Sequence, residues 1–286
     1  MIAALVDGRP AQSLPLDDRA LHYGDGVFET IRMHGPQPRA WAVHMARLGA
    51  GCQRLGLGSS PAAVLLGDLA RLAPGATDWV AKVILSRAPG PRGYRPGSVL
   101  APRRVVLAYP DPADQSEPVT LQLCRTLLAG PPRLAGLKHL NCLGLILASA
   151  ELPAGDDQVG LLREPSGAIV CATGANLFWV RNGRLETPAL AIAGVAGVTR
   201  ARIIAQARRL GLRRGIGTFG LAALLAADEA FICNAVRGIR PVGMLHWVTP
   251  SGTRTRHWSP GPFADRLSVG LRVESSDPHG RVPWPC

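Results

Sequence analysis

The sequence predicts a mixed α/β protein of two domains: a small N-terminal α/β domain over residues 1–112 and a larger mixed α/β domain over residues 113–286, with a cleft between them. Helix-like and strand-like runs alternate along the chain. Its 286 residues, 47% of them hydrophobic, suffice for two cores. The polar, proline-bearing stretch DPADQSEP (111–118) is the best candidate for a linker.

The N-terminal domain is expected to begin with a strand and a turn, followed by a helix or a strand start at HYGDGVFET. AWAVHMARLGAGCQRLGL (40–57) has apolar residues at helical spacing and ends at glycines, so it predicts a helix. A second helix is expected over about 61–73. WVAKVILSR (79–87) and RRVVLAYP (103–110) predict two strands, joined by a loop rich in Gly, Pro and Arg.

The C-terminal domain is predicted from the same patterns. The expected elements, in chain order, are a strand at VTLQLCRT, a helix beginning near Lys138, strands at QVGLLR, GAIVCA and ANLFWV, a turn at 181–183 into RLETP, a helix over 197–212, and a helix, a strand at FIC and a loop within 221–242.

Composition and charge exclude several classes of protein. The net charge of +12 is spread over arginines that never run more than two together, which argues against nucleic-acid binding and favours small anionic substrates. No apolar run approaches the ~20 residues that span a bilayer. Six scattered cysteines without metal-finger spacing are typical of reduced thiols, so we expect a soluble cytoplasmic protein that binds neither nucleic acid, membrane nor metal.

Lysine is rare in this chain. Of 32 basic residues only Lys82 and Lys138 are lysines, although arginine serves everywhere else. Arginine stays protonated, whereas a buried lysine can lose its proton and attack a carbonyl carbon. Lys138, in LAGLKHLNCLGL, is therefore a candidate nucleophile, and a plain surface lysine is the alternative.

Four stretches in a fixed order point to one family. LDDRALHYGDGVFETIR (16–32), HMARL (44–48), GLKHLN (136–141) and the C-terminal set ANLFWV, AGVAGVTR and FICNAVRGIRPV together resemble the fold-type IV pyridoxal-phosphate enzymes over about residues 3–245. The family includes amino-acid aminotransferases and aminodeoxychorismate lyases. GLKHLN, RGY (92–94) and ICNAVRGIRPV are most similar to the lyase branch, which makes 4-aminobenzoate and pyruvate in folate biosynthesis.

The resemblance implies a set of cofactor-binding residues. Lys138 would form the Schiff base with pyridoxal 5′-phosphate and shuttle protons as general acid and base. Arg47 matches the arginine that grips the cofactor phosphate. Val198 and Thr199 open a predicted helix where N–H groups and a hydroxyl can cradle a phosphate. Asn234 and Ala235 match a second loop on the phosphate side. The family also implies a homodimer and a cofactor cleft between the domains.

Substrate contacts follow from the same resemblance. Tyr23, Phe28, Thr30 and Arg32 would face the cofactor, and Tyr94 would reach over the substrate. Aminodeoxychorismate carries two carboxylates, so Arg92, Arg95 or Arg240 are candidates to bind one of them, with a solvated loop arginine as the alternative for each. His139 is expected to be structural.

One departure separates this chain from the family. Where the family has a glutamate that pairs with the pyridine nitrogen, five residues before Asn176, this chain has Cys171. A neutral thiol is a weak substitute for a carboxylate that keeps the ring protonated. Three readings follow: a slower lyase, a paralogue with changed chemistry, or a cofactor-binding protein without activity. An aminotransferase of the same fold is the other enzyme hypothesis, and it would suffer more from the loss of the carboxylate.

Overall fold

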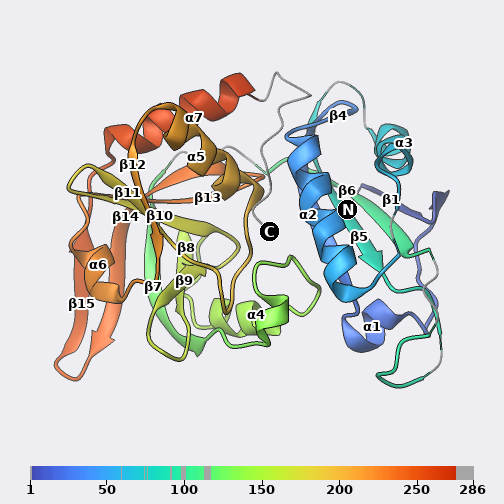
Figure 1. Cartoon of the computed structure of the whole chain (residues 1–286), viewed down its shortest axis with the longest axis horizontal. Coiled ribbons are helices and arrows are strands. Elements are labelled where there is room, and N and C mark those ends of the chain that lie inside the picture. Colours follow the sequence, from blue (N-terminus) through green and yellow to red (C-terminus); the bar gives the residue numbers. More distant parts are fainter. Residues whose placement is uncertain are drawn as a thin grey trace. The chain divides into compact units, whose positions relative to one another are not determined.

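The computed structural model describes residues 2–274 except 59, 74, 76, 91, 98–100 and 113–116. The chain divides into two compact units (Figure 1). Within the described ranges, the first holds residues 1–113 together with 137–141, and the second holds 114–136 and 142–277. The main division lies close to the predicted boundary, but 137–141 packs in the first unit instead of the second. Part of the predicted linker, 113–116, lies outside the described residues.

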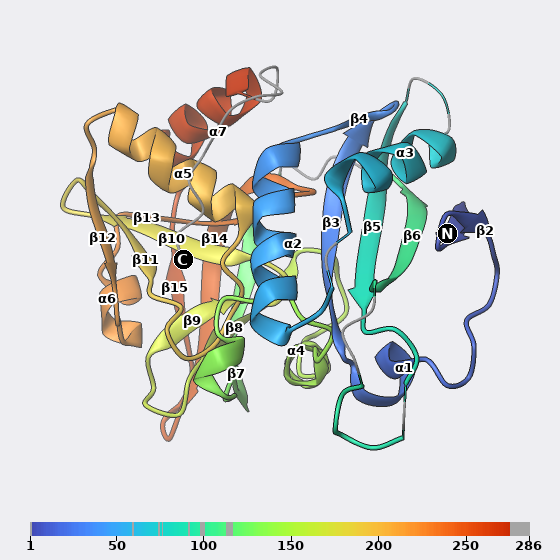
Figure 2. The same ribbon diagram turned by 45° about the vertical axis from the view of Figure 1, so that its right-hand side comes forward.

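The first unit is a six-stranded sheet with helices, in the strand order β2-β1-β6-β5-β3-β4. Its strands are β1 (Ala3–Val6), β2 (Arg9–Pro10), β3 (Gly26–His34), β4 (Gln37–Pro38), β5 (Asp78–Ser86) and β6 (Arg103–Pro110). Its helices are α1 (Arg19–Tyr23), α2 (Trp41–Leu55) and α3 (Ala62–Leu72). Helices α2 and α3 lie on one face of this sheet (Figure 2).

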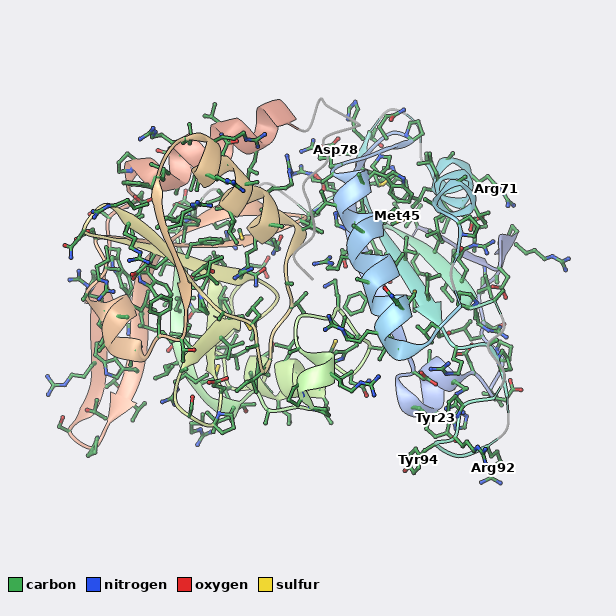
Figure 3. All side chains as sticks on the ribbon, viewed as in Figure 1. Tyr23, Met45, Arg71, Asp78, Arg92 and Tyr94 are labelled. Atoms are coloured by element: carbon green, nitrogen blue, oxygen red, sulfur yellow. The ribbon has the colours of Figure 1, made fainter. Side chains whose placement is uncertain are left out.

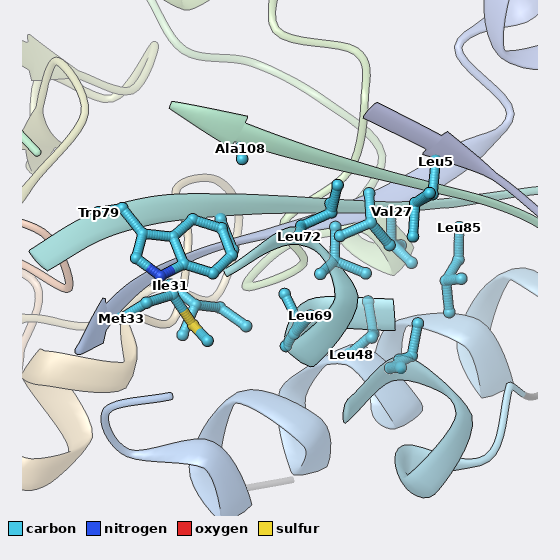
Figure 4. Packing of buried hydrophobic residues seen from close by; sticks show 14 of the residues in the cluster. Leu5, Val27, Ile31, Met33, Leu48, Leu69, Leu72, Trp79, Leu85 and Ala108 are labelled. Atoms are coloured by element: carbon cyan, nitrogen blue, oxygen red, sulfur yellow. The ribbon is translucent and has the colours of Figure 1, made fainter. Parts of the chain in front are cut away.

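The sheet of the first unit has two different faces, as the alternating burial along most of β3 shows. The odd-numbered positions of β3, such as Ile31 and Met33, are buried and pack with Trp79 and with Leu48 of α2 (Figure 4). Phe28, Thr30 and Arg32, at even-numbered positions, are half-buried and point to the other face, because successive side chains of a strand alternate. Trp79 Nε1 donates a hydrogen bond to the carbonyl of Gly35 at 2.7 Å, so the buried indole N–H has a hydrogen-bond partner.

The second unit is built on a nine-stranded sheet in the order β12-β11-β10-β13-β14-β7-β8-β9, with β15 paired to β14. Its strands are β7 (Val119–Leu127), β8 (Gln158–Arg163), β9 (Ile169–Ala172), β10 (Asn176–Arg181), β11 (Arg184–Pro188), β12 (Arg213–Gly217), β13 (Glu229–Asn234), β14 (Gly238–Thr249) and β15 (Gly252–His257). Its helices are the 3₁₀ turn η1 (Pro132–Leu134), α4 (Leu143–Ser149), α5 (Val198–Arg209), α6 (Leu221–Leu225) and α7 (Pro262–Glu274). No helix in the described part of the chain is long and apolar enough to cross a membrane.

Two expectations from the sequence are wrong. The helix expected to begin near Lys138 begins at Leu143, because residues 138–140 are extended and pair with β3. The loop expected after FIC becomes strand β14 at Gly238, because β13, β15 and β7 all supply hydrogen-bonding edges for it. In both places a tertiary partner overrides the local pattern.

Candidate functional site

Lys138 is held by backbone pairing with β3. The amide of Phe28 donates to the carbonyl of Lys138 at 2.9 Å, and the amide of Leu140 donates to the carbonyl of Gly26 at 3.0 Å. The backbone of His139 forms an antiparallel bridge with Val27 in the same register. The Lys138 ammonium lies 4.2 Å from the centre of the Phe28 ring, a cation–π contact. Both its backbone and its amine are therefore positioned by one strand.

Arg47 is buried in an ion-pair network on the helix-covered face of the same sheet. His44 and Arg47 are one helical turn apart on α2, and both reach Glu29 of β3. Arg47 Nε donates to Glu29 Oε1 at 2.7 Å while its Nη2 contacts Oε2. His44 Nδ1 donates to Oε2 at 2.6 Å. All three side chains are at most 6% exposed, so the carboxylate is satisfied entirely by protein donors.

The electrostatics of this network follow from burial. Burial alone would raise the pKa of Glu29, but the charges of Arg47 and His44 and their hydrogen bonds outweigh it and lower the pKa from 4.5 to about 2. Burial lowers the pKa of His44 below its ordinary 6.5, and Glu29 opposes that shift. The charge of Lys138 also lowers the pKa of His44, so the lysine and the network interact electrostatically. At neutral pH the network is a Glu29–Arg47 ion pair with a neutral histidine.

The half-buried face of the sheet holds three of the predicted substrate residues. Phe28, Thr30 and Arg32 occupy alternate positions of β3, on the face away from the helices. Arg32 Nη2 lies 2.6 Å from Asp111 and 3.4 Å from Asp78, so its guanidinium already holds two carboxylates. That pairing supports a structural use of Arg32, whereas Phe28 and Thr30 stay predicted as substrate contacts.

The loop that contains RGY is fastened to α1. Tyr23 accepts a hydrogen bond from the amide of Gly93 at 3.0 Å, and its ring meets the ring of Tyr94 edge-on at 5.9 Å. Tyr23, Arg92 and Tyr94 are at one end of the first unit (Figure 3). Tyr94 is 91% exposed, and Arg92 and Arg95 are exposed as well. The structure brings Tyr23 and Tyr94 together but leaves the two arginines facing solvent.

In the second unit, the first turn of α5 has hydrogen-bond donors without partners among the described residues. No side chain caps this helix, and its first turn holds no acidic residue. In the described chain, the amides of Val198, Thr199 and Arg200 and the Thr199 hydroxyl make no hydrogen bond, although Thr199 is only 5% exposed. Such unused donors at a helix start are what a phosphate requires. The residues present therefore fit the phosphate of pyridoxal phosphate.

Asn176 and Asn234 shape the backbone around this helix start. Asn176 Nδ2 donates to the carbonyl of Val195 at 2.8 Å, and its amide lies so close to Gly197 that a Cβ there would overlap it. Asn234 Oδ1 accepts from the amides of Val236 and Arg237 at 3.1 and 2.7 Å, which closes the loop after β13. Asn234 thus builds the loop with its side chain. The amide of Ala235 makes no hydrogen bond in the described chain.

Cys171 lies in an apolar cluster on β9. Its buried neighbours are Cys124, Ala148, Leu162 and Val170. Burial raises the pKa of its thiol from 9.0 to about 12, and no charged group contributes to that shift. The nearby Glu164 accepts instead from Ser166 Oγ at 2.7 Å at the exposed turn after β8. No carboxylate in the described chain replaces the family glutamate at Cys171.

Arg240, the third candidate arginine, is buried. Its Nη2 donates to the carbonyl of Glu117 at 3.2 Å, and burial lowers its pKa. Its contact with the backbone supports a structural use within the sheet.

Sequence reasoning missed three residues of the first unit. Glu29 and His44 were not recognised as partners of Arg47, although the spacing of HMAR places both α2 side chains on one helix face. Lys82 was noted only as the second lysine. The nearly continuous apolar run WVAKVILS does not show which face Lys82 occupies, and only its pairing with Thr30 of β3 places it beside Phe28.

Comparison with known proteins places these features in a family. The family model of class IV amino-transferases matches residues 26–244. An aminodeoxychorismate lyase of Vibrio harveyi is 34% identical over 242 residues, which cover 83% of this chain and 89% of the relative. A putative branched-chain-amino-acid aminotransferase of Methanocaldococcus jannaschii is 30% identical over 79% of this chain and 80% of its own.

A solved structure is similar along nearly the whole chain. The 4-amino-4-deoxychorismate lyase from Pseudomonas aeruginosa superposes with a TM-score of 0.86 at 38% identity, covering 95% of this chain and 98% of that one. The mixed α/β architecture predicted from the sequence is thereby confirmed.

Proposed function

This chain belongs to the class IV aminotransferase family, and we propose that it is an aminodeoxychorismate lyase of folate biosynthesis. It would convert 4-amino-4-deoxychorismate to 4-aminobenzoate and pyruvate with pyridoxal 5′-phosphate as cofactor. The similarity to lyases of Vibrio harveyi and Pseudomonas aeruginosa supports this activity. The observation that carries it is Lys138, one of two lysines, fixed to β3 with its amine over Phe28.

Each proposed cofactor residue has a physical basis. When bound, pyridoxal phosphate supplies an aldehyde for an amine and a ring that withdraws electrons from neighbouring carbon. The Lys138 amine would hold the aldehyde carbon and then move a proton at Nζ. Val198 and Thr199 would donate to the phosphate from the start of α5, and the amide of Ala235 is free to add another donor. Arg47 would bring positive charge toward the phosphate while Glu29 holds its guanidinium in place.

Cys171 favours the lyase over the aminotransferase. Its thiol is neutral at physiological pH and its surroundings are apolar, so it offers no negative charge to a ring nitrogen. Release of an aromatic product supplies its own driving force, whereas transamination has to stabilise charge on the ring through a complete proton transfer. The likeness to a putative branched-chain aminotransferase keeps transamination as the second candidate.

We also propose a homodimer in the cytoplasm. Leu143, Ile146 and Leu147 lie on one side of α4 and are 66%, 61% and 54% exposed, an apolar surface suited to a second copy. The five cysteines in the described chain are all free thiols, which suits a reducing compartment; Cys286 lies outside the described residues. Light scattering of purified protein, with Ile146→Glu as the variant expected to dissociate, tests the dimer.

The test of function is release of 4-aminobenzoate from aminodeoxychorismate with added pyridoxal phosphate. The native protein should release it, and Lys138→Ala should not. Lys138→Arg is a matched control because it keeps the charge and cannot act as the nucleophile. If native protein takes up the cofactor but releases no 4-aminobenzoate, the lyase is excluded. Transfer of an amino group to 2-oxoglutarate or pyruvate would then establish the aminotransferase. If no amino group is transferred either, the protein would be one that binds the cofactor without catalysis.

A further inference from the structure

The second lysine of the chain lies beside the first. Lys82 is on β5, directly opposite Thr30 of β3 in the antiparallel register. Its ammonium is 5.1 Å from the centre of the Phe28 ring, and that of Lys138 is 4.2 Å from the same centre. The two nitrogens are thus separated by at most the sum of these distances, about 9 Å. A chain with thirty arginines has placed both of its lysines around one aromatic ring.

Lys82 lies on the substrate-facing side of the sheet. It is half-buried, whereas its neighbours Ala81 and Val83 are completely buried on the opposite, helix-covered face. Register pairs it with Thr30 on one side and Leu107 on the other, and directly opposed residues share a face. Its side chain therefore joins the face that carries Phe28 and Thr30, the predicted substrate residues.

No carboxylate in the described chain pairs with Lys82. Arginines of the neighbouring strands β3 and β6 are paired: Arg32 with Asp78 and Asp111, and Arg104 with Asp68. Among the described residues, the one contact recorded for the Lys82 ammonium is with the Phe28 ring. An ammonium beside an aromatic ring and without a counter-ion among the described residues is available to pair with an anion.

We propose that Lys82 is a binding residue for a carboxylate of the substrate, working beside Lys138 on the same sheet face. The identity of the substrate rests on the proposed function. The inference extends that function by naming a residue that binds a carboxylate of the substrate. Aminodeoxychorismate carries two carboxylates, and one compact ammonium accepts one of them. A flexible lysine side chain can place its compact ammonium between Phe28 and Leu107 to bind a carboxylate. The planar guanidinium of an arginine would need more room there.

Binding of chorismate to the holoenzyme tests this directly by calorimetry. Chorismate is a dicarboxylate with a hydroxyl in place of the amine, so it probes carboxylate recognition without reacting. Lys82→Gln should raise its Kd by about tenfold or more, the effect of losing a charge-assisted hydrogen bond. Lys82→Arg should bind between the two. Arg9→Gln removes one charge from an exposed position on β2 of the same sheet and should leave the Kd unchanged.

Two further readouts separate recognition from structure. Thermal melting and cofactor uptake should be close to native in Lys82→Gln, and in the activity assay its KM should rise more than its kcat falls. A lowered melting temperature with native chorismate affinity would overturn the proposal, as would native protein that does not bind chorismate at all. Chorismate binding that depends on Lys82 in a protein that releases no 4-aminobenzoate would support this inference and reject the lyase.

Discussion

The two units bury their functional positions in opposite ways. In the first, Glu29 is completely buried yet ionised, because Arg47 and His44 supply donors to both of its oxygens. In the second, Cys171 is 5% exposed among apolar side chains and thiols, and no charged group of the described residues contributes to the shift of its pKa. The position where the resemblance predicts a carboxylate is thus part of a hydrophobic cluster in this chain.

This contrast shows what a buried carboxylate requires. A charge away from water is tolerated only with partners that replace its hydration, and Glu29 has three donated contacts. Around Cys171 no such partner exists in the described chain, so a glutamate there would depend on a bound group to satisfy it. Glu29 can stay ionised because protein donors balance its charge, and Cys171 has no comparable partners among the described residues.

The largest effect is expected from breaking the charged network. Glu29→Ala leaves the buried guanidinium of Arg47 without its counter-ion, so the free energy of unfolding should fall by about 3–5 kcal/mol. Urea denaturation measures this, and Glu117→Ala, at an exposed position, is the matched control. A loss below about 1 kcal/mol would mean that Arg47 finds another partner or water, as exposed pairs do.

Placing a carboxylate in the apolar cluster should have the next largest effect. Cys171→Glu should lower the free energy of unfolding of the cofactor-free protein by about 2–4 kcal/mol, because the new side chain has no partner. With pyridoxal phosphate bound the loss should shrink and 4-aminobenzoate release should rise. Cys171→Ser controls for loss of the thiol alone. An equal loss with and without cofactor, and no gain in rate, would show that residue 171 does not face the ring.

Acid should weaken the first unit through the same network. Glu29 has a pKa lowered from 4.5 to about 2, so its contribution to stability is fully present above pH 4.5 and is lost as the pH falls toward 2. His44 acts in the same direction, since its lowered pKa makes protonation below pH 6.5 unfavourable in the folded state. Urea midpoints of native protein and Glu29→Gln across this range should converge at low pH. Parallel curves would contradict the assignment.

The smallest effect concerns thiol reactivity. Burial raises the pKa of both Cys171 and Cys233 to about 12, so neither should react with a thiol reagent in folded protein at neutral pH. Peptide mass mapping after labelling with and without denaturant identifies each site. Labelling of Cys171 in the folded state, and its protection by pyridoxal phosphate, would instead indicate an accessible thiol near the cofactor.

Local pattern determined much of this protein. The helical spacing of 40–57 predicted α2, which spans Trp41–Leu55, and the strand patterns of 79–87 and 103–110 predicted β5 and β6 within one residue. The rarity of lysine singled out Lys138 without any structure. These features depend on neighbours a few residues apart, whose periodicity is written in the chain. The family resemblance, carried by ordered motifs, is confirmed by the family model.

Only the tertiary structure decided the rest. Residues 138–140 are extended because β3 offers a free edge at Val27, and no local signal reveals that edge. Glu29 and Arg47 are 18 positions apart, and Lys82 and Lys138 meet at Phe28 only once β3, β5 and the segment 137–141 are assembled. Such contacts arise from pairing and burial across long sequence separations. The sequence alone therefore identified Lys138 as the candidate catalytic lysine, and the fold determined which charges surround it.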